Sequence, residues 1–381
     1  MKSVRFGDLC KLQNGRAFKP EEWSEEGTPI VRIQNLNDET KPFNYCNFDV
    51  EKRFWIDSGD LLFSWSGTPG TSFGAFFWNR GKGFLNQHIF RVDVKEELVD
   101  KHYLRYALNS LIVQIIDQAH GGVGLKHITK GKLEEVQIPL PPLPEQRRIV
   151  SILDKADELR QKRQQAIEKL DRLLQATFID MFGDPVSNSK GWDSSTLGEQ
   201  CEVGTGSTPS RQNAEYFVGN IPWVKSTEVD WGTITDTSEK ISKDGKNSAR
   251  LKMYPKGSII LALYGQGITR GKSALLGIEA TLNQACAALI TKGSVNNYFV
   301  FSFLRFSYEN LRNQARGGNQ ENLNLNIVKS FPIYLPPIEL QEKWSKIALS
   351  IEDQKQKLYK QLDIQNQLFS SLQNQAFSGT L

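Results

Sequence analysis

Two long segments of the chain place apolar or small residues at alternating steps of three and four. In the first, which begins near Glu145, these residues are Ile149, Ile152, Ala156, Leu159, Ala166, Leu170, Leu173 and Thr177, with Arg163 as an interruption. The second runs through Trp344, Ile347, Ile351, Leu358, Leu362, Phe369, Leu372 and Ala376, with Lys355 and Gln365 on the same face. This heptad spacing predicts two long helices that bury their stripes against each other.

The length of these helices bears on how they pack. At 1.5 Å per residue, about 37 residues make a rod of roughly 55 Å. That is long beside a domain of about 140 residues, whose radius of gyration is near 14 Å. Pairing of the two helices is therefore favoured over the alternative, in which each packs only on its own domain. Both helices end their domains in the same order, so we expect an antiparallel pair with a globular domain at each end.

A segment of short apolar runs, typical of strands, precedes each long helix. The runs are 30–33, 59–65 and 88–92 in the first segment, and 221–224, 257–263 and 285–290 in the second. A shorter helix with an apolar stripe follows each set, and a glycine pair ends it. Both segments therefore predict mixed strand and helix content.

The two halves repeat the same landmarks at a nearly constant offset. Pro141 and Pro336 are 195 positions apart (336 − 141), and so are Gln146 and Gln341. The dipeptide Asn86-Gln87 returns as Asn283-Gln284, 197 positions later. So long a period indicates a duplicated domain with its connector rather than a solenoid.

The repeat and the patterns together predict an α+β fold. Two similar mixed α/β domains, at 1–142 and 184–337, are separated by two long helices, at 143–183 and 338–381, that form an antiparallel coiled coil. Two similar halves on one chain suggest the same task carried out at two similar places.

Composition sets the class of protein. The 381 residues are 39% hydrophobic and 24% charged, which is ordinary for a soluble globular protein of two domains. No apolar run reaches the roughly 18 residues that span a bilayer, and the first residues lack a signal-peptide core. The four cysteines are scattered without metal-ligand spacing, which favours a reducing cytoplasm. The net charge of +4 alone is weak evidence for nucleic-acid binding.

Signatures of catalysis are missing from the sequence. Residues 265–273 imitate a phosphate-binding loop, but Gln266 stands where that loop needs glycine. Asp184-Pro185 continues with Val186, so it does not complete the Asn/Asp-Pro-Pro-Tyr signature of amino-methylating enzymes. The histidines (His88, His102, His120 and His127) have no ligand-spaced partners and are interpreted as structural. A non-enzyme is expected.

The proline-rich junction carries a more specific signal. Residues 139–149 read Pro-Leu-Pro-Pro-Leu-Pro-Glu-Gln-Arg-Arg-Ile, and a predicted long helix follows, and then Met-Phe-Gly-Asp-Pro at 181–185. A second, weaker copy occupies 334–344, where Leu340 replaces Glu145. With these motifs and the ending Gln-Ala-Phe-Ser-Gly at 375–379, the whole chain resembles the DNA-specificity subunits of Type I restriction–modification systems.

The resemblance implies a non-catalytic subunit. Each target-recognition domain would read one half of a bipartite, asymmetric double-stranded DNA target, and the helices would set the gap between the halves. The implied partners are two modification subunits, which methylate adenine with S-adenosylmethionine, and restriction subunits, which use ATP and Mg. No cofactor is expected in this chain itself.

Candidate contact residues follow from the chemistry of recognition. Arg, Lys, Asn and Gln read base edges, whereas Lys, Arg, Ser and Thr hold phosphates. In the first half the candidates are Arg32, Gln34, Asn35, Ser66, Thr68, Lys126 and His127. In the second half they are Lys225, Ser226, Thr227, Gln266, Thr269, Arg270, Lys272, Asn319, Gln320 and Asn322. For docking of a modification subunit, the candidates are apolar residues of the first long helix outside its seam: Leu153, Ile167, Leu174 and Phe178.

Three other interpretations of the sequence stay open. The chain could be a catalytic methyltransferase or nuclease, which the missing motifs disfavour. It could be a coiled-coil adaptor that never contacts DNA. It could also be a specificity subunit of a related system that is not Type I. The target sequence cannot be deduced from one chain.

Overall fold

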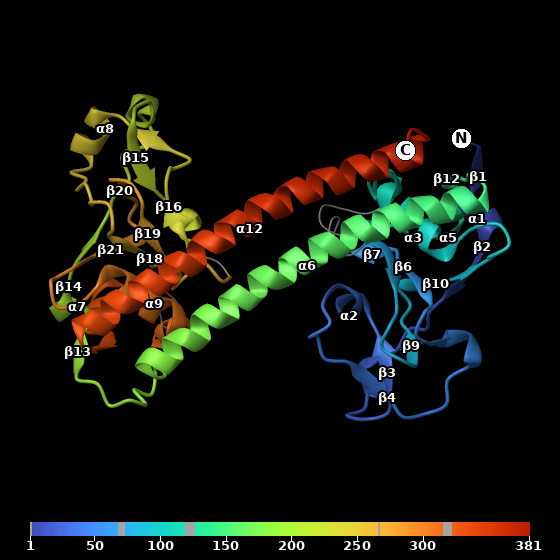
Figure 1. The fold of residues 1–381 in the computed structure, drawn as a ribbon, viewed down its shortest axis with the longest axis horizontal. Coiled ribbons are helices and arrows are strands. Elements are labelled where there is room, and N and C mark those ends of the chain that lie inside the picture. The colour runs from blue at the N-terminus through green and yellow to red at the C-terminus, as the bar shows by residue number, and fades with distance from the viewer. Residues whose placement is uncertain (1, 68–72, 119–125, 266, 315–321) are drawn as a thin grey trace. The chain divides into compact units, whose positions relative to one another are not determined.

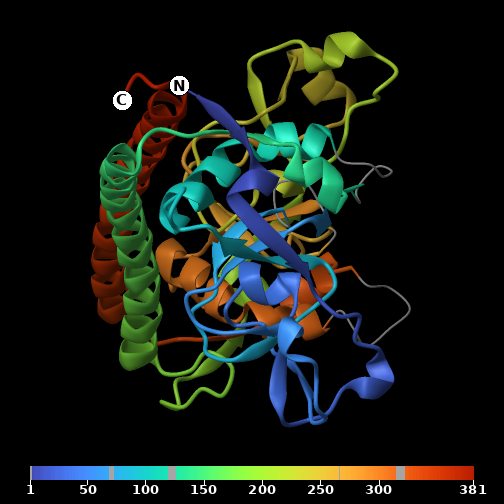
Figure 2. The same ribbon diagram turned by 90° about the vertical axis from the view of Figure 1, so that its right-hand side faces the viewer.

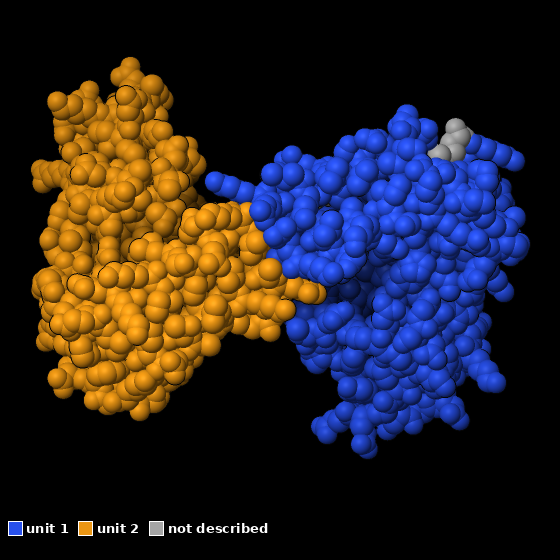
Figure 3. Space-filling view, in the orientation of Figure 1, with its two compact units in different colours: residues 1–164, 360–381 blue, residues 165–359 orange. Residues whose placement is uncertain are grey.

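The computed structural model describes residues 2–67, 73–118, 126–265, 267–314 and 322–381. The chain forms two compact units, coloured separately in Figure 3. Unit 1 comprises residues 1–164 and 360–381, and unit 2 comprises residues 165–359. Each unit contains a globular α/β part and one segment from each of two long helices, α6 (Leu143–Phe182) and α12 (Ile338–Ser378) (Figure 1).

Unit 1 contains two four-stranded sheets. The first has the order β2-β10-β6-β8 and is antiparallel throughout, with strands Cys10–Asn14, Ile89–Val94, Leu61–Ser64 and Gly74–Phe77. The second has the order β4-β3-β9-β5, with strands Asn44–Cys46, Thr28–Val31, Gly83–Leu85 and Trp55–Ile56. Strand β1 (Ser3–Arg5) pairs with β12 (Gln137–Pro139), immediately before α6. The helices of this globular part are α1 (Phe6–Leu9), α2 (Ile33–Asn37), α3 (Lys101–Ser110), α4 (Ile112–Asp117) and α5 (Lys130–Glu134).

Unit 2 follows the same plan. Strand β13 (Ser194–Thr196) pairs with β22 (Pro332–Tyr334), immediately before α12. The larger sheet has the order β14-β21-β18-β19-β16, with strands Cys201–Thr205, Cys286–Thr291, Ile259–Ala262, Ser273–Leu276 and Thr233–Ile234. The smaller has the order β17-β15-β20, with strands Lys240–Ile241, Ile221–Val224 and Thr281–Leu282. The helices are α7 (Leu197–Gln200), α8 (Lys243–Ser248), α9 (Asn297–Phe306), α10 (Tyr308–Gln314) and α11 (Leu325–Ser330).

The two long helices run antiparallel within each unit (Figures 1 and 2). In unit 1, Arg160 of α6 donates from Nε to Asn366 Oδ1 of α12 at 2.8 Å. In unit 2, Lys355 Nζ of α12 lies 2.7 Å from Asp171 Oδ1 of α6. As the position along α6 rises from Arg160 to Asp171, the partner along α12 falls from Asn366 to Lys355, as antiparallel pairing requires. The predicted fold class is confirmed.

Each helix also extends the core of the globular parts. In unit 1, Ile149 and Leu153 of α6 and Phe369 of α12 join the core that contains Tyr103 and Leu104 of α3. In unit 2, the helix residues of the core are Leu174, Phe178, Phe182, Trp344, Ala348 and Ile351, and they pack with Phe299 and Leu304 of α9. Burial of large apolar side chains therefore fastens both ends of each helix to a domain.

The stripe that is buried differs from the predicted seam. Leu159 and Leu173 belong to that seam, yet they are 46% and 51% exposed. Ile167 and Leu174, which were placed outside the seam, are 1% and 3% exposed. The reason is that each helix packs both on the other long helix and on the globular parts of the two units. Packing on the domain, the alternative interpretation, thus accounts for part of the pattern.

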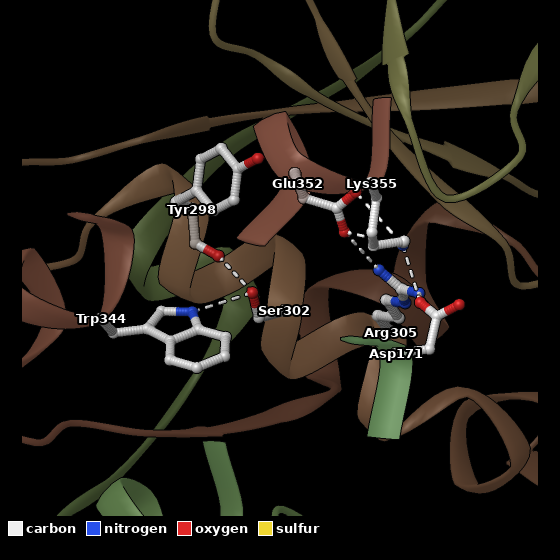
Figure 4. A network of polar contacts seen from close by, with 7 residues as sticks. All are labelled: Asp171, Tyr298, Ser302, Arg305, Trp344, Glu352 and Lys355. Carbon is white, nitrogen blue, oxygen red and sulfur yellow. Dashed lines mark hydrogen bonds and ion pairs between the residues drawn. The ribbon is translucent and has the colours of Figure 1, made fainter. Parts of the chain in front are cut away.

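Lys355, which breaks the apolar seam of α12, is buried within an ion-pair network in unit 2 (Figure 4). Its Nζ contacts Asp171 at 2.7 Å and Glu352 at 3.2 Å. Arg305 of α9 contacts the same two carboxylates at 3.0 and 3.1 Å. A satisfied polar residue in a helical seam favours one register over its alternatives.

Candidate nucleic-acid interface

In unit 1, the loop that follows β9 joins the ends of two other strands. The Asn86 N–H donates to the Val31 carbonyl oxygen at 3.2 Å, at the end of β3. The His88 carbonyl oxygen accepts from the Trp65 N–H at 3.3 Å, just after β6. We call residues 86–88, together with 283–285 of unit 2, the Asn–Gln loops. Arg32 and Ser66, the residues that follow Val31 and Trp65, are thereby brought to one loop cluster.

A third predicted segment reaches the same cluster. Ser66 lies in β7 (Ser66–Gly67), which pairs antiparallel with β11 (Lys126–His127), so that Ser66 stands opposite His127. The Ile128 N–H also donates to the Trp65 carbonyl oxygen at 3.1 Å. Candidates that are some sixty positions apart in the sequence therefore lie side by side.

A cavity of about 210 Å³ opens beside the Asn–Gln loop of unit 1. It is lined by Phe18, Trp23, Arg32, Ile33, Gln34, Asn86, Gln87 and His88. The Arg32 guanidinium lies 5.4 Å from the centre of the Trp23 ring and donates to Asn44 Oδ1 at 2.9 Å. Sites for small organic ligands have volumes of roughly 300–1,000 Å³, so this cavity suits one edge of a larger ligand.

The charge of this cavity comes from Arg32. Burial, with the nearby charge of Arg32, lowers the pKa of His88 below its ordinary value of 6.5, which keeps the imidazole neutral at pH 7. His88 Nδ1 and Gln87 Oε1 are shielded from solvent and have no hydrogen-bond partner among the described residues. Buried polar atoms are normally hydrogen-bonded, so these two side chains beside the cavity each have a hydrogen-bonding atom that is not used within the described residues.

Unit 2 reproduces these junctions. The Asn283 N–H donates to the Val224 carbonyl oxygen at 2.9 Å, and the Leu263 N–H donates to the Ala285 carbonyl oxygen at 2.8 Å. The Leu323 N–H donates to the Leu263 carbonyl oxygen at 3.1 Å. The second Asn–Gln loop thus joins the segments that carry the candidates of unit 2, from Lys225 to Asn322.

Two candidate lysines of unit 2 already have anionic partners. Lys225 Nζ lies 2.8 Å from Glu239 Oε1, and Lys272 Nζ lies 2.6 Å from Asp230 Oδ1. Only 25% and 12% of these lysine side chains are exposed. Either lysine would have to exchange its carboxylate for a phosphate in order to hold DNA.

The remaining candidates divide by exposure. Gln34, His127, Thr227 and Asn322 are exposed, whereas Ser66, Lys126, Ser226, Thr269 and Arg270 are half-buried. Asn35 is buried, and its amide donates to the carbonyl oxygens of Lys41 and Pro42 at 3.1 and 3.2 Å. The expectation that Asn35 faces DNA is therefore wrong, because its side chain closes a local turn. Thr68, Gln266, Asn319 and Gln320 lie outside the described residues.

The predicted docking residues Leu153, Ile167, Leu174 and Phe178 are all buried, so the surface proposed for them is wrong. Other apolar residues of the long helices are exposed. They are Leu159, Ile364 and Leu368 in unit 1, and Leu173, Ile179, Leu349 and Tyr359 in unit 2. In unit 1, a groove of about 420 Å³ is lined by Leu159 and Leu368, together with Ile152 and Ala156.

Other classes of site are not evident in the described ranges. They hold no cluster of His, Cys, Asp or Glu able to bind a metal ion. All four cysteines are buried free thiols. Within these ranges, no helix is both long and apolar enough to cross a bilayer.

Sequence similarity identifies the family. The profile described as "Type I restriction modification DNA specificity domain" matches residues 1–169 and again residues 189–367. The chain belongs to this family. It is 26% identical over 373 residues to the Type I restriction enzyme MjaVIII specificity subunit of Methanocaldococcus jannaschii, covering 92% of this chain and 85% of that protein.

Two solved structures from Type I restriction–modification systems have the same fold as this chain. A Type I restriction–modification S subunit from M. genitalium superposes with a TM-score of 0.61 at 16% identity, covering 99% of this chain and 96% of that one. A chain from a study of complex assembly and conformational transition in a Type I system gives 0.55 at 18% identity, covering 100% and 98%. At these identities the likeness concerns the fold alone.

Gln87 and Gln284 are not among the contact residues predicted from the sequence. Their signal was present as the Asn-Gln dipeptide that recurs 197 positions later (284 − 87). This dipeptide was interpreted as a sign of the duplication and not as a pair of residues that could bind DNA.

Proposed function

We propose that this chain is the DNA-specificity subunit of a Type I restriction–modification complex, and that each unit reads one half of a bipartite duplex target. The observation that carries the proposal is the repeated loop cluster, in which the same three segments meet at an Asn–Gln loop in both units. Two similar but divergent clusters suit two half-sites of different sequence. Loops held by a rigid scaffold are the usual place for recognition residues.

The subunit is proposed to be non-catalytic. Its clusters offer neutral amides, hydroxyls and arginines, which form hydrogen bonds with base edges and phosphates. The proposed methyl transfer and DNA cleavage belong to partner subunits, which would bring S-adenosylmethionine, ATP and Mg. This chain would determine the DNA sequence to which the complex binds.

The long helices are proposed to set the gap between the half-sites. Both α6 and α12 continue without interruption from one unit into the other. Uninterrupted helices are stiff, so a fixed separation in the protein would select a fixed separation in the DNA. Each helix has nearly balanced charge, which argues against a role as a phosphate track.

Docking of modification subunits is proposed for the exposed apolar residues of the helices. Leu173 in unit 2 and Leu368 in unit 1 are 195 positions apart (368 − 173), the offset of the sequence repeat, and are 51% and 54% exposed. Exposed apolar groups that cluster on a helix pair favour a protein partner. Equivalent residues in both units would bind two copies of one partner.

Binding by the chain assembled with its modification subunit tests the function. Sequencing of methylated DNA from a host that carries both genes should list a bipartite motif. Duplexes with either half-site scrambled should then bind far more weakly than the intact target. A complex that binds no duplex even at low salt would favour the coiled-coil adaptor, and methyl transfer by the isolated chain would favour the enzyme.

A further inference from the structure

The Asn-Gln dipeptide of the repeat has a residue with a structural role and a residue without one. Asn86 is buried and its carbonyl oxygen accepts from the Ile89 N–H at 3.1 Å. In unit 2, Asn283 Oδ1 accepts from the Ala285 N–H at 3.1 Å. These bonds hold the loops in shape. Gln87 and Gln284, in contrast, add no hydrogen bond from their side chains to the loop backbone within the described ranges.

Both Asn–Gln loops are backed by a glycine that permits close contact of two backbones. A Cβ on Gly15 would collide with the Asn86 carbonyl oxygen, and a Cβ on Gly206 would collide with that of Leu282. The Arg16 N–H donates to the Leu85 carbonyl oxygen at 2.9 Å. A loop pressed against a strand end in this way presents its side chains from a fixed backbone.

The glutamine of unit 1 faces the cavity. Gln87 lines it together with Arg32 and Gln34, and its Oε1 is shielded from solvent without a partner among the described residues. An unpaired buried acceptor is unfavourable, so turning the Gln87 side chain to bring this oxygen to a donor on a ligand gains a hydrogen bond. The side-chain amide can offer an acceptor and two donors at one edge.

The glutamine of unit 2 is exposed and oriented. Gln284 Oε1 accepts from the Thr208 hydroxyl. The oxygen retains a second lone pair, and within the part of the chain that the structure describes its amide N–H groups form no other bond. Thr208 therefore fixes the direction of the amide while leaving its donor and acceptor available.

We infer that Gln87 and Gln284 are equivalent base-reading residues, each recognising the adenine of an A·T pair at the same position of its half-site. A glutamine amide matches adenine in the major groove, because its oxygen accepts from the N6 amino group while its nitrogen donates to N7. A neutral amide gives no charge attraction to phosphate, so a base edge is the better ligand. The inference rests on the proposed function and adds the residue and the base.

The test uses the full chain assembled with its modification subunit, in the wild type and in the variants Gln87→Ala and Gln284→Ala. Sequencing of methylated host DNA gives the motif of each protein. We expect Gln87→Ala to lose the requirement for one A·T pair in one half-site, and Gln284→Ala to lose the equivalent requirement in the other. Discrimination at that pair should fall about 10-fold to 100-fold, with the other positions unchanged.

Gln13→Ala is the matched control, because the amide of Gln13 donates to the neighbouring Asn14 carbonyl oxygen at 2.8 Å and lies outside the cavity lining. It should keep the wild-type motif. If a glutamine variant abolishes methylation, binding of the purified complex to target duplexes changed one base pair at a time replaces the methylation readout. An unaltered adenine preference in both glutamine variants overturns the inference. A wild-type complex without any bipartite motif overturns the proposed function instead.

Discussion

Gln146, the glutamine of the proline-rich junction, accepts a hydrogen bond at its Oε1 from the Asp100 N–H at 2.8 Å. Its amide nitrogen donates to the Pro141 carbonyl oxygen at 2.8 Å. Asp100 is the N-cap of α3, since its carboxylate accepts from the N–H groups of His102 and Tyr103. One buried side chain thus ties the start of a long helix to the start of a domain helix.

Unit 2 contains the same arrangement. Gln341 Oε1 accepts from the Asn296 N–H at 2.8 Å, and its nitrogen donates to the Pro336 carbonyl oxygen at 2.8 Å. Asn296 is the N-cap of α9. The glutamine in the repeated motif therefore fixes how each globular part holds its long helix.

Replacing Gln146 or Gln341 by leucine should lower the free energy of unfolding by about 2 kcal/mol, because buried backbone groups lose their partner. Urea unfolding of the full chain measures the change. Gln137→Leu is the control, since this glutamine is exposed and donates to the nearby Glu135 carbonyl oxygen at 3.1 Å. Equal stability of Gln137→Leu and Gln146→Leu would contradict the role of the junction.

Within the ion-pair network of unit 2, the effects of changing Lys355 and Asp171 on stability should be coupled. Lys355→Met leaves Arg305 beside Asp171 and Glu352, and Asp171→Leu leaves Glu352 beside Lys355. We expect each change to destabilise unit 2, by about 1–3 kcal/mol since Asp171 is partly exposed, and the double variant to lose clearly less than the sum. Additive losses would mean that the two side chains do not interact.

The control for that cycle is an ion pair of similar length on the surface of α12. Lys357 Nζ lies 2.7 Å from Asp353, and both side chains are mostly exposed. Lys357→Met should change the free energy of unfolding by less than about 0.5 kcal/mol. A large effect there would show that surface charge, rather than burial, governs the helix pair.

The extent and antiparallel direction of the long helices were predictable, but the face that each helix buries was not. The heptad spacing predicted a first helix from near Glu145 and a second through Trp344 to Ala376, and the structure has helices at Leu143–Phe182 and Ile338–Ser378. Which face of each helix is buried depends on its contacts with the other long helix and with the globular parts. The spacing of apolar residues does not distinguish between these contacts. The sequence therefore predicted the wrong docking residues on a correctly predicted helix.

The loop cluster was predictable in part. The segments placed after core strands do meet, because the Asn–Gln loop that follows β9 bonds to the end of β3, in the same sheet, and to the residue after β6, in the other sheet. The fate of each side chain was not predictable, since its partner is distant in the sequence. Lys225 meets Glu239 from 14 positions away, and Lys272 meets Asp230 from 42 positions away.

Docking should fail when the exposed apolar residues gain charge. The double variant Leu173→Asp/Leu368→Asp should fold normally, because both side chains are about half exposed, and it should lose capture of the modification subunit. Co-purification of the two subunits measures this. Val218→Asp is the control, since Val218 is 75% exposed on the globular part of unit 2.

Two outcomes would count against this docking face. One is normal capture by the Leu173→Asp/Leu368→Asp variant, and the other is loss of capture by Val218→Asp. Leu174→Asp and Phe178→Asp serve a different purpose, because both residues are core residues of unit 2. These two variants should unfold that unit rather than remove docking selectively.

Stability should depend on the protonation of His88. Its pKa is lowered in the folded chain by burial and by the charge of Arg32, so the unfolded chain binds a proton more readily. The wild type should therefore lose free energy of unfolding as the pH falls below about 6.5. His88→Ala, which copies Ala285 of unit 2, should lose less between pH 7.5 and 5.5 in urea titrations. Parallel losses in the two proteins would contradict this assignment.

The central claim is that two reading units are held at a set distance by the long helices. Inserting seven residues after Gln164 in α6 and seven after Tyr359 in α12 keeps the heptad phase and adds about 10 Å, close to three base pairs of rise. Methylated-DNA sequencing should list unchanged half-sites with a longer gap. If methylation is lost, binding to duplexes with the gap extended by one to four pairs is measured instead.

The length of the gap in the methylated motif of the wild type and of the double insertion shows whether the helices set the distance between the half-sites. We expect the same two half-sites separated by a longer gap, of up to about three additional base pairs. An unchanged gap at full activity, or altered half-sites at the original gap, would contradict this expectation.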